Sequence, residues 1–226
     1  MKDNISQISE IKLRGVLPRV FDDKAGRERF DRSQVMLADL SFRRGEVYCL
    51  NARSGTGKTS LCSFIYGSRH DYCGSISFND TDVSTLGVNG WCEVRRRHLA
   101  YLPQELDIFD ELTAMDNVRL KNRLTGCKTD TEITDMFRRL GIDNLLDRPA
   151  GRMSVGQKQR VAIVRALCQP YDFILLDEPV SHLDAYNNSQ CAAMIMEDAR
   201  RQDAGVIFTS VGNPLAVDAP VTQLTL

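Results

Sequence analysis

The sequence predicts an α/β fold, with a core sheet, an antiparallel β layer beside it and a helical insert. Two apolar runs predict core strands, 47–50 and 173–176, and four consecutive apolar residues in the second fit a strand buried on both faces of a parallel sheet. Between these runs, apolar residues over 112–152 recur at intervals of three and four, which predicts short helices. Short alternating segments before the first run predict the antiparallel layer.

A glycine-bearing loop follows the first core strand and leads into a predicted helix. Its residues are Asn51, Ala52, Arg53, Ser54, Gly55, Thr56, Gly57, Lys58, Thr59 and Ser60. Gly55 and Gly57 allow the backbone to curl so that successive N–H groups face phosphate oxygens. Lys58 is placed to reach the β- and γ-phosphates of a nucleotide, and the Thr59 hydroxyl to hold Mg²⁺. The usual phosphate-loop pattern opens with glycine, and Ala52 departs from it by one methyl group.

Two carboxylates follow the second core strand at its C-terminal end, where ligands bind in open α/β sheets. We expect Asp177 to hold Mg²⁺, directly or through water, and Glu178 to orient or deprotonate an attacking water. The alternative is a salt-bridged acidic pair that only caps the strand. The glycine loop upstream favours the catalytic interpretation.

Two further positions are candidates for the same chemistry. Gln104 follows a predicted strand at 98–102, where its amide could touch Mg²⁺ or the attacking water. Without further context, a solvated loop glutamine is the favoured interpretation. Ser154 precedes Gly156 and an apolar helical run, so it predicts a serine-capped helix N-terminus, which is a second anion site.

The antiparallel layer is predicted from alternating segments at 8–20, 35–42 and 74–79, with a charged loop or hairpin tip at 22–33. Phe21 lies at the end of the first segment and could stack on a nucleotide base. The alternative is an ordinary buried aromatic residue, and Phe30 is the second candidate for the stacking role.

Bulk composition limits the partners. With 29 basic and 30 acidic residues the net charge is −1, which argues against a dominant nucleic-acid surface. The 7 cysteines form no C-x-x-C pair and are expected to be reduced, mostly buried thiols. The sequence has no apolar signal core and no window near the ~18 apolar residues of a membrane span. We therefore expect a cytoplasmic protein whose membrane role depends on partner chains.

The order of these pieces resembles the nucleotide-binding subunit of an ATP-binding cassette (ABC) transporter over essentially the whole chain. The matching motifs are the Walker A loop (52–59), the Q-loop glutamine Gln104, the signature motif (153–157), the Walker B aspartate Asp177 with the catalytic Glu178, and the D-loop (181–184). Phe21 matches the aromatic residue that stacks on adenine. The signature motif makes the resemblance specific, because other phosphate-loop enzymes lack it.

The resemblance implies one ABC ATPase domain over 1–226 with a RecA-like P-loop NTPase core. Residues of about 1–50 and 74–80 would form the antiparallel β subdomain, and about 105–155 the helical subdomain that leads to the signature motif. ATP and Mg²⁺ are the implied cofactors, with Thr59, Gln104 and Asp177 as metal ligands. Nucleotide contacts are implied for Phe21, Ala52, Arg53, Ser54, Gly55, Thr56, Gly57, Lys58, Thr59, Ser60, Ser154, Gly156, Gln157 and Asp184.

The resemblance also implies partners. Two subunits, identical or paralogous, would pair head to tail, with each ATP held between the Walker A loop of one and Ser154, Gly156 and Gln157 of the other. Transmembrane permease subunits would hold the pair on the inner face of the membrane. The small subunits that serve lipoprotein release, macrolide export and cell division are the most similar type.

Three departures bear on activity: Ala52, Val155 in the signature motif, and Ser210 where the family has a switch histidine that contacts the γ-phosphate. A serine hydroxyl is shorter and uncharged, so slow hydrolysis is expected, with a catalytic role for Ser210 beside Glu178 and Gln104. One alternative is a weakly hydrolysing or inactive ATP switch that signals through a membrane partner. Another is a soluble ABC ATPase of DNA repair or translation, although no coiled coil, zinc insert or second cassette is visible.

Overall fold

The computed structural model describes residues 6–51 and 55–226, and its core is a five-stranded parallel sheet. The strand order is β6-β7-β8-β3-β9, and every neighbouring pair is parallel. The strands are β3 (Val47–Asn51), β6 (Leu99–Leu102), β7 (Phe173–Leu176), β8 (Gly205–Ser210) and β9 (Thr222–Thr225). The predicted α/β fold is confirmed, and β9 forms the edge of the sheet beside β3.

Two hydrophobic cores lie on opposite faces of this sheet. Successive side chains of a strand point to opposite faces, and β7 shows the result: Ile174 and Leu176 enter one core, and Phe173 and Leu175 the other. All four side chains are fully buried. Burial of such a side chain stabilises the fold by about 1.5–3 kcal/mol, which explains why these apolar runs form the central strands.

The second sheet is antiparallel, with the order β2-β1-β4-β5. Its strands are β1 (Glu10–Pro18), β2 (Asp39–Arg43), β4 (Tyr72–Phe78) and β5 (Thr81–Asp82). The predicted strand at 35–42 starts too early, because the chain turns at Leu37, where φ is +61°. The predicted loop at 22–33 contains the short helix α1 (Lys24–Glu28), capped by the Asp23 carboxylate, which accepts from the Gly26 N–H at 2.6 Å.

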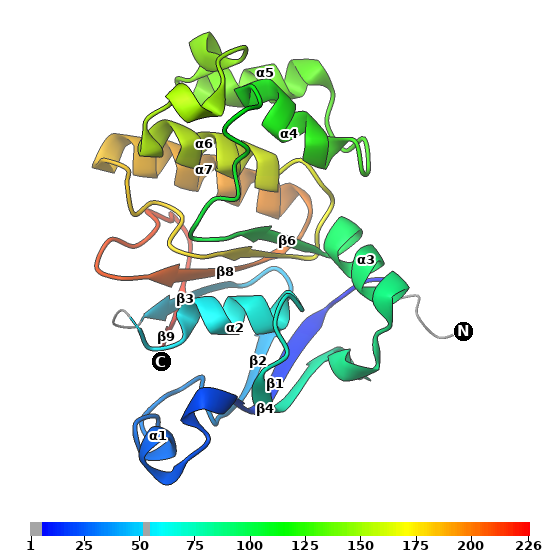
Figure 1. Cartoon of the computed structure of the whole chain (residues 1–226), viewed down its shortest axis with the longest axis vertical. Coiled ribbons are helices and arrows are strands. Elements are labelled where there is room, and N and C mark those ends of the chain that lie inside the picture. Colours follow the sequence, from blue (N-terminus) through cyan, green and yellow to red (C-terminus); the bar gives the residue numbers. More distant parts are fainter. Residues whose placement is uncertain (1–5, 52–54) are drawn as a thin grey trace.

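Seven α-helices complete the described part of the chain. Besides α1 they are α2 (Lys58–Ile65), α3 (Val88–Arg97), α4 (Ala114–Asn122), α5 (Asp130–Arg139), α6 (Val155–Ala166) and α7 (Ala185–Arg201). In Figure 1, α4 and α5 lie at the end of the molecule opposite the antiparallel sheet, with α6 and α7 between them and the parallel sheet. None of the helices in the described ranges is long and apolar enough to cross a bilayer.

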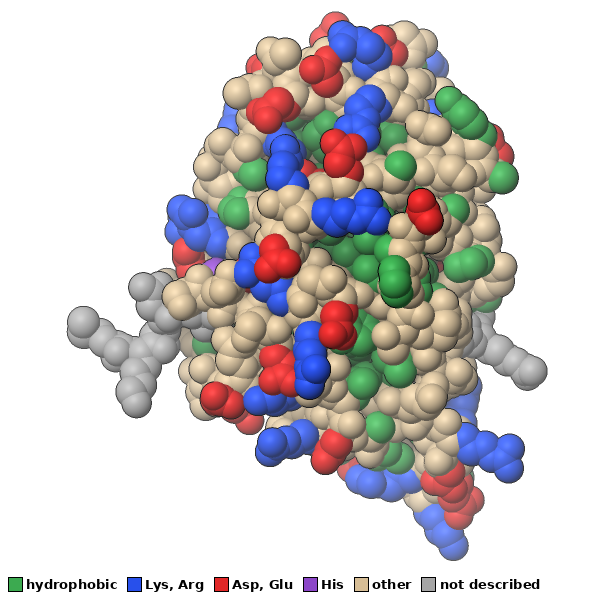
Figure 2. All heavy atoms as spheres, turned by 180° about the vertical axis from the view of Figure 1, so that it is seen from behind, with side chains coloured by type: hydrophobic (Ala, Val, Ile, Leu, Met, Phe, Trp, Pro, Cys, Tyr) green, Lys and Arg blue, Asp and Glu red, His purple; other side chains and the backbone are tan. Residues whose placement is uncertain are grey.

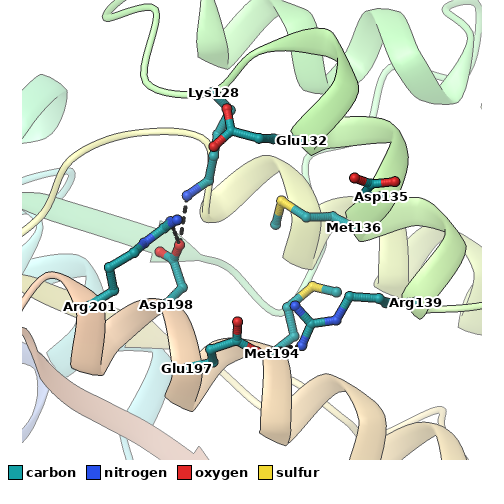
Figure 3. Close-up of a pocket in the computed structure, with 9 residues that line it drawn as sticks. All are labelled: Lys128, Glu132, Asp135, Met136, Arg139, Met194, Glu197, Asp198 and Arg201. Carbon is teal, nitrogen blue, oxygen red and sulfur yellow. Dashed lines mark hydrogen bonds and ion pairs between the residues drawn. The ribbon is translucent and has the colours of Figure 1, made fainter.

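A cavity of about 170 Å³ lies between α5 and α7, and charged side chains from both helices border it (Figure 3). The Lys128 ammonium, just before α5, is 2.6 Å from the Asp198 carboxylate on α7, and both side chains are buried. The Tyr171 hydroxyl also donates to this carboxylate, at 2.8 Å. A second pair, between Arg139 and Glu197, spans the same two helices at 2.6 Å. These contacts fasten the helical insert to the core.

The surface charge is mixed. Figure 2 shows basic and acidic side chains interspersed over one face of the molecule, with no large area of a single sign. This distribution agrees with the net charge of −1. The expectation that nucleic acid is not a partner stays a prediction.

Candidate active site

The phosphate loop runs from β3 to the N-terminus of α2. Gly55 and Gly57 have φ values of +77° and +94°, a left-handed conformation that glycine adopts without strain. A Cβ atom at Gly57 would also approach the Met36 methyl carbon to 3.2 Å. Gly57 is the N-cap of α2, so the loop leads into a helix N-terminus, where backbone N–H groups can face an anion. Ala52, Arg53 and Ser54 lie outside the described residues.

The loop opens onto a pocket of about 360 Å³. Its lining comes from the end of β1, the phosphate loop, the turn after α2 and the loops after β6 and β7. The lining residues are Pro18, Val20, Phe21, Gly55, Gly57, Lys58, Thr59, Ser60, Arg69, Gln104 and Glu178. Segments far apart in the sequence thus converge on one pocket, and they include Phe21, Lys58, Gln104 and Glu178, which the motifs single out.

Lys58 and Glu178 face each other in this pocket. The Lys58 Nζ is 3.7 Å from Glu178 Oε1, and the lysine side chain is buried. Glu178 has a φ of +50°, which is uncommon for a residue with a side chain. Its N–H donates to Thr209 Oγ1 at 2.9 Å, which holds this backbone conformation at the end of β7.

Asp177 directly precedes the pocket-lining Glu178 and is almost fully buried. Its Oδ1 accepts a hydrogen bond from the Thr209 hydroxyl at 2.6 Å, whereas its Oδ2 is buried without a hydrogen-bond partner in the described structure. Thr59 Oγ1 and Gln104 Oε1 lie 3.4 Å apart in the same pocket. A carboxylate oxygen that lacks a donor, together with hydroxyl and amide oxygens, is the type of donor set that Mg²⁺ prefers.

Thr209 is a residue of the candidate site that the motifs did not assign. Its hydroxyl contacts both acidic residues. The available signal was a hydroxyl at the end of an otherwise apolar strand, directly before Ser210. Ser210 itself is 4% exposed and pairs in register with Asn51 of β3. It is not among the pocket-lining residues of the described chain, so its catalytic role stays a prediction.

The structure separates the two candidates for stacking on a base. Phe30 is 3% exposed and packs on Phe21, with ring centroids 5.4 Å apart. Phe21 is only partly buried and lines the pocket. The Arg29 guanidinium carbon lies 5.3 Å from the Phe21 centroid and 5.9 Å from the Phe30 centroid. This geometry favours Phe21 over Phe30.

The signature segment begins α6. The Ser154 hydroxyl accepts from the Gln157 N–H at 3.3 Å and the Gln157 side chain accepts from the Ser154 N–H at 2.9 Å, which forms a capping box. Gly156 is close to the D-loop, because a Cβ there would lie 3.1 Å from the His182 carbonyl oxygen. These three residues do not line the pocket of the described chain.

The D-loop ends at α7, whose N-cap is Asp184. The carboxylate accepts from the Asn187 N–H at 2.8 Å. This hydrogen bond, with a further one from the Asn187 side chain, holds the pKa of Asp184 below its usual range. In the described chain Asp184 does not line the pocket, and its predicted role at the nucleotide is not tested by this geometry.

Comparison with known proteins supports these motifs. Residues 36–181 match the family model described as "ABC transporter". The ABC transporter ATP-binding protein YtrE of Bacillus subtilis is 32% identical over 175 residues, which cover 76% of this chain and 75% of YtrE. The Fe(3+) ions import ATP-binding protein FbpC of Haemophilus influenzae is 34% identical over 80% of this chain, but over only 53% of FbpC.

Solved structures show the same fold. The dimeric bacterial ABC transporter cassette MJ0796 has a TM-score of 0.75 over 95% of this chain and 94% of its own, at 20% sequence identity. A second dimeric structure of that cassette, described as a post-hydrolysis state bound to ADP and Pi, has a TM-score of 0.73.

Proposed function

Because the chain belongs to the ABC transporter family as an ATP-binding subunit with ATPase activity, we propose that its pocket binds ATP with Mg²⁺ and that Glu178 carries the hydrolysis. One observation carries the assignment: Lys58, Thr59, Gln104 and Glu178 line a single pocket, and the buried Asp177 directly precedes Glu178. The two glycines of the loop aim backbone donors at the same space.

Mg²⁺ fits the oxygen atoms that the pocket provides. Thr59 and Gln104 would hold it, and Asp177 would act through the Oδ2 atom that lacks a hydrogen-bond donor. Bound Mg²⁺ neutralises the charge that develops on the phosphate oxygens. The buried carboxylate of Asp177 would otherwise remain only half satisfied, which costs about 1–3 kcal/mol.

Each side chain of the site would have a separate role in ATP binding and hydrolysis. The Lys58 ammonium binds the terminal phosphates, and the Glu178 carboxylate orients a water molecule and accepts its proton. Thr209 keeps the Glu178 backbone in its left-handed conformation through the hydrogen bond from the Glu178 N–H. Phe21 would stack on the adenine at the other end of the pocket.

A second subunit would complete each site. Ser154, Gly156 and Gln157 lie at the N-terminus of α6 and do not line the pocket of their own described chain, and Val155 between them is 52% exposed. A head-to-tail pair would bring this helix N-terminus to the γ-phosphate of the partner's ATP. The dimeric cassette structures with the same fold support this arrangement.

A groove of about 250 Å³ beside the Gln104 loop is the proposed contact with a membrane permease. Three apolar side chains at this groove are unusually exposed: Phe109 by 53%, Leu120 by 42% and Leu124 by 55%. Burial and the nearby Arg165 charge lower the pKa of Lys121, also in the groove, to about 8. An apolar permease segment in this groove would hold the chain at the cytoplasmic face of the membrane. Conformational changes at the nucleotide would reach this segment through Gln104.

Nucleotide binding tests the proposal. Lys58→Ala removes the cation that meets the terminal phosphates, so the Kd for ATP should rise by at least about tenfold. Isothermal titration of the purified chain measures this, with Lys158→Ala as a control: Lys158 is a surface lysine 2.6 Å from Asp110 and outside the pocket. Equal affinity for ATP in the wild type and Lys58→Ala would contradict the assignment of this pocket as the ATP site.

A further inference from the structure

Arg69 is a charged residue of the pocket that no motif assigns. It follows α2, and its Nη1 donates to Ser60 Oγ at 2.9 Å. Its Nε and Nη2 donate to the two carboxylate oxygens of Asp71 at 2.9 and 2.5 Å. The guanidinium carbon also lies 5.3 Å from the ring centroid of Phe64. The carboxylate, the hydroxyl and the ring therefore fix the guanidinium beside the phosphate loop.

These contacts leave hydrogen-bonding capacity. A guanidinium has five N–H donors, and the contacts with Asp71 and Ser60 use three of them within the described structure. The Arg69 side chain is 44% exposed and lines the pocket, so an anion in the pocket can reach it without displacing Asp71. Pre-ordered arginine forks bind phosphate well because little conformational freedom is lost on binding.

The position of Ser60 indicates which phosphates Arg69 would meet. Ser60 lies two residues after Lys58 on α2, and a step of two residues turns a helix by about 200°. Arg69 therefore approaches from the side of α2 opposite to Lys58, and Lys58 lies 3.7 Å from the catalytic carboxylate of Glu178. The γ-phosphate belongs at the Lys58–Glu178 side, so Arg69 is directed at the other end of the phosphate chain.

We propose that Arg69 is a nucleotide-binding residue that donates hydrogen bonds to the phosphates that ATP and ADP share. The inference rests on the proposed function, because it assumes that this pocket binds ATP. It assigns Asp71 a positioning role, since the carboxylate holds the guanidinium fork in place. It also predicts that Arg69 contributes to the retention of ADP after hydrolysis, and not only to the binding of ATP.

The test is isothermal titration of the full chain with ADP and with the β,γ-imido analogue of ATP, both with Mg²⁺. Arg69→Gln should raise the Kd of both ligands by about tenfold, as expected for a charge-assisted hydrogen bond. Arg69→Lys keeps the charge but loses the guanidinium fork. For each ligand, its Kd should lie between those of the wild type and Arg69→Gln. Arg119→Gln is the matched control, because it removes an exposed Arg–Asp pair, with Nη2 2.6 Å from Asp130, and neither residue lines the pocket of the described chain.

Two results would overturn the inference. One is unchanged affinity of Arg69→Gln for both ligands; the other is a loss confined to the ATP analogue, which would place Arg69 at the γ-phosphate. Failure of the wild type to bind either ligand is a different outcome, because it removes the proposed function and this inference together.

Discussion

The hydroxyl of Thr209 connects the two acidic residues of the site. It donates to Asp177 at 2.6 Å and accepts from the Glu178 N–H at 2.9 Å. The first bond orients the proposed metal ligand, and the second holds the left-handed backbone of the proposed catalytic residue. A single hydroxyl therefore positions two groups that must act together.

Thr209→Val tests this role. The variant keeps the shape of the side chain but leaves Asp177 Oδ1 and the Glu178 N–H without this partner. We expect kcat for ATP hydrolysis to fall by about tenfold or more, because the carboxylate is misplaced, and stability to fall by about 1–3 kcal/mol. Thr209→Ser, which keeps the hydroxyl, should retain most of kcat. Full activity in Thr209→Val would show that the bridge is dispensable.

The sequence identified Lys58, Asp177 and Glu178 because each lies at a fixed offset from a glycine loop or an apolar strand. It could not identify Thr209 or Arg69 in the same way. Their roles depend on neighbours in space: Thr209 faces Asp177 from 32 positions away, and Arg69 reaches the pocket only through the turn after α2. A hydroxyl at the end of an apolar strand marks Thr209 as a candidate, but the sequence does not show which residues it contacts.

At the level of elements, α6 is tied to the turn after β7 by one side chain. The amide nitrogen of Gln159 donates to the Glu178 carbonyl at 3.2 Å, and its oxygen accepts from the His182 N–H at 3.2 Å. Gln159 is almost completely buried. A displacement of the signature helix would therefore be transmitted to the catalytic turn and the D-loop.

Gln159→Leu removes both hydrogen bonds at nearly constant volume. We expect kcat to fall by about tenfold while the Kd for ATP changes by less than about twofold, since the bridge acts on Glu178 and not on the phosphate loop. Gln169→Leu is the matched control, because Gln169 is equally buried and donates to the Leu99 carbonyl at 3.0 Å. Equal loss of activity in the two variants would mean that Gln159 acts only through stability.

Some element boundaries could not be predicted from sequence. The run at 35–38 is apolar because Val35 and Met36 enter the core, but the turn at Leu37 keeps it out of the β ladder. Burial therefore explains its composition without strand pairing. In contrast, the start of α7 coincides with a sequence signal, because Asp184 immediately precedes the helix and caps it by accepting from the Asn187 N–H.

For the molecule as a whole, a buried ion pair adds to the apolar packing that attaches the helical insert to the core. The Lys128–Asp198 pair lies at the cavity of Figure 3, between α5 and α7. The exposed pair Arg139–Glu197 joins these two helices at the same cavity. Burial raises the pKa of Asp198, but the hydrogen bond and charge of Lys128, together with hydrogen bonds from Tyr171 and Gln202, outweigh it, so that the pKa lies below its usual value of 3.8.

Lys128→Met should destabilise the fold by about 3–5 kcal/mol, because it leaves Asp198 buried without its main counter-charge. Arg139→Met, the control at the exposed pair, should cost about 0–1 kcal/mol. Urea unfolding at pH 7 measures both. Since the folded pKa of Asp198 is lowered, the wild-type advantage is present above pH 3.8 and is lost as the pH falls through the folded value. Equal losses of unfolding free energy in the two variants would contradict the claim that the buried Lys128–Asp198 pair stabilises the fold more than the exposed pair does.

The most direct test of the central claim is the steady-state ATPase rate of the purified chain with Mg²⁺, compared with that of Glu178→Gln. If Glu178 orients and deprotonates the water, the glutamine variant should lose at least about 100-fold in kcat. Its Kd for ATP should stay close to the wild-type value, because Lys58 and the phosphate loop are intact. Hydrolysis at the wild-type rate in Glu178→Gln would contradict the account, because the reaction would then use another base.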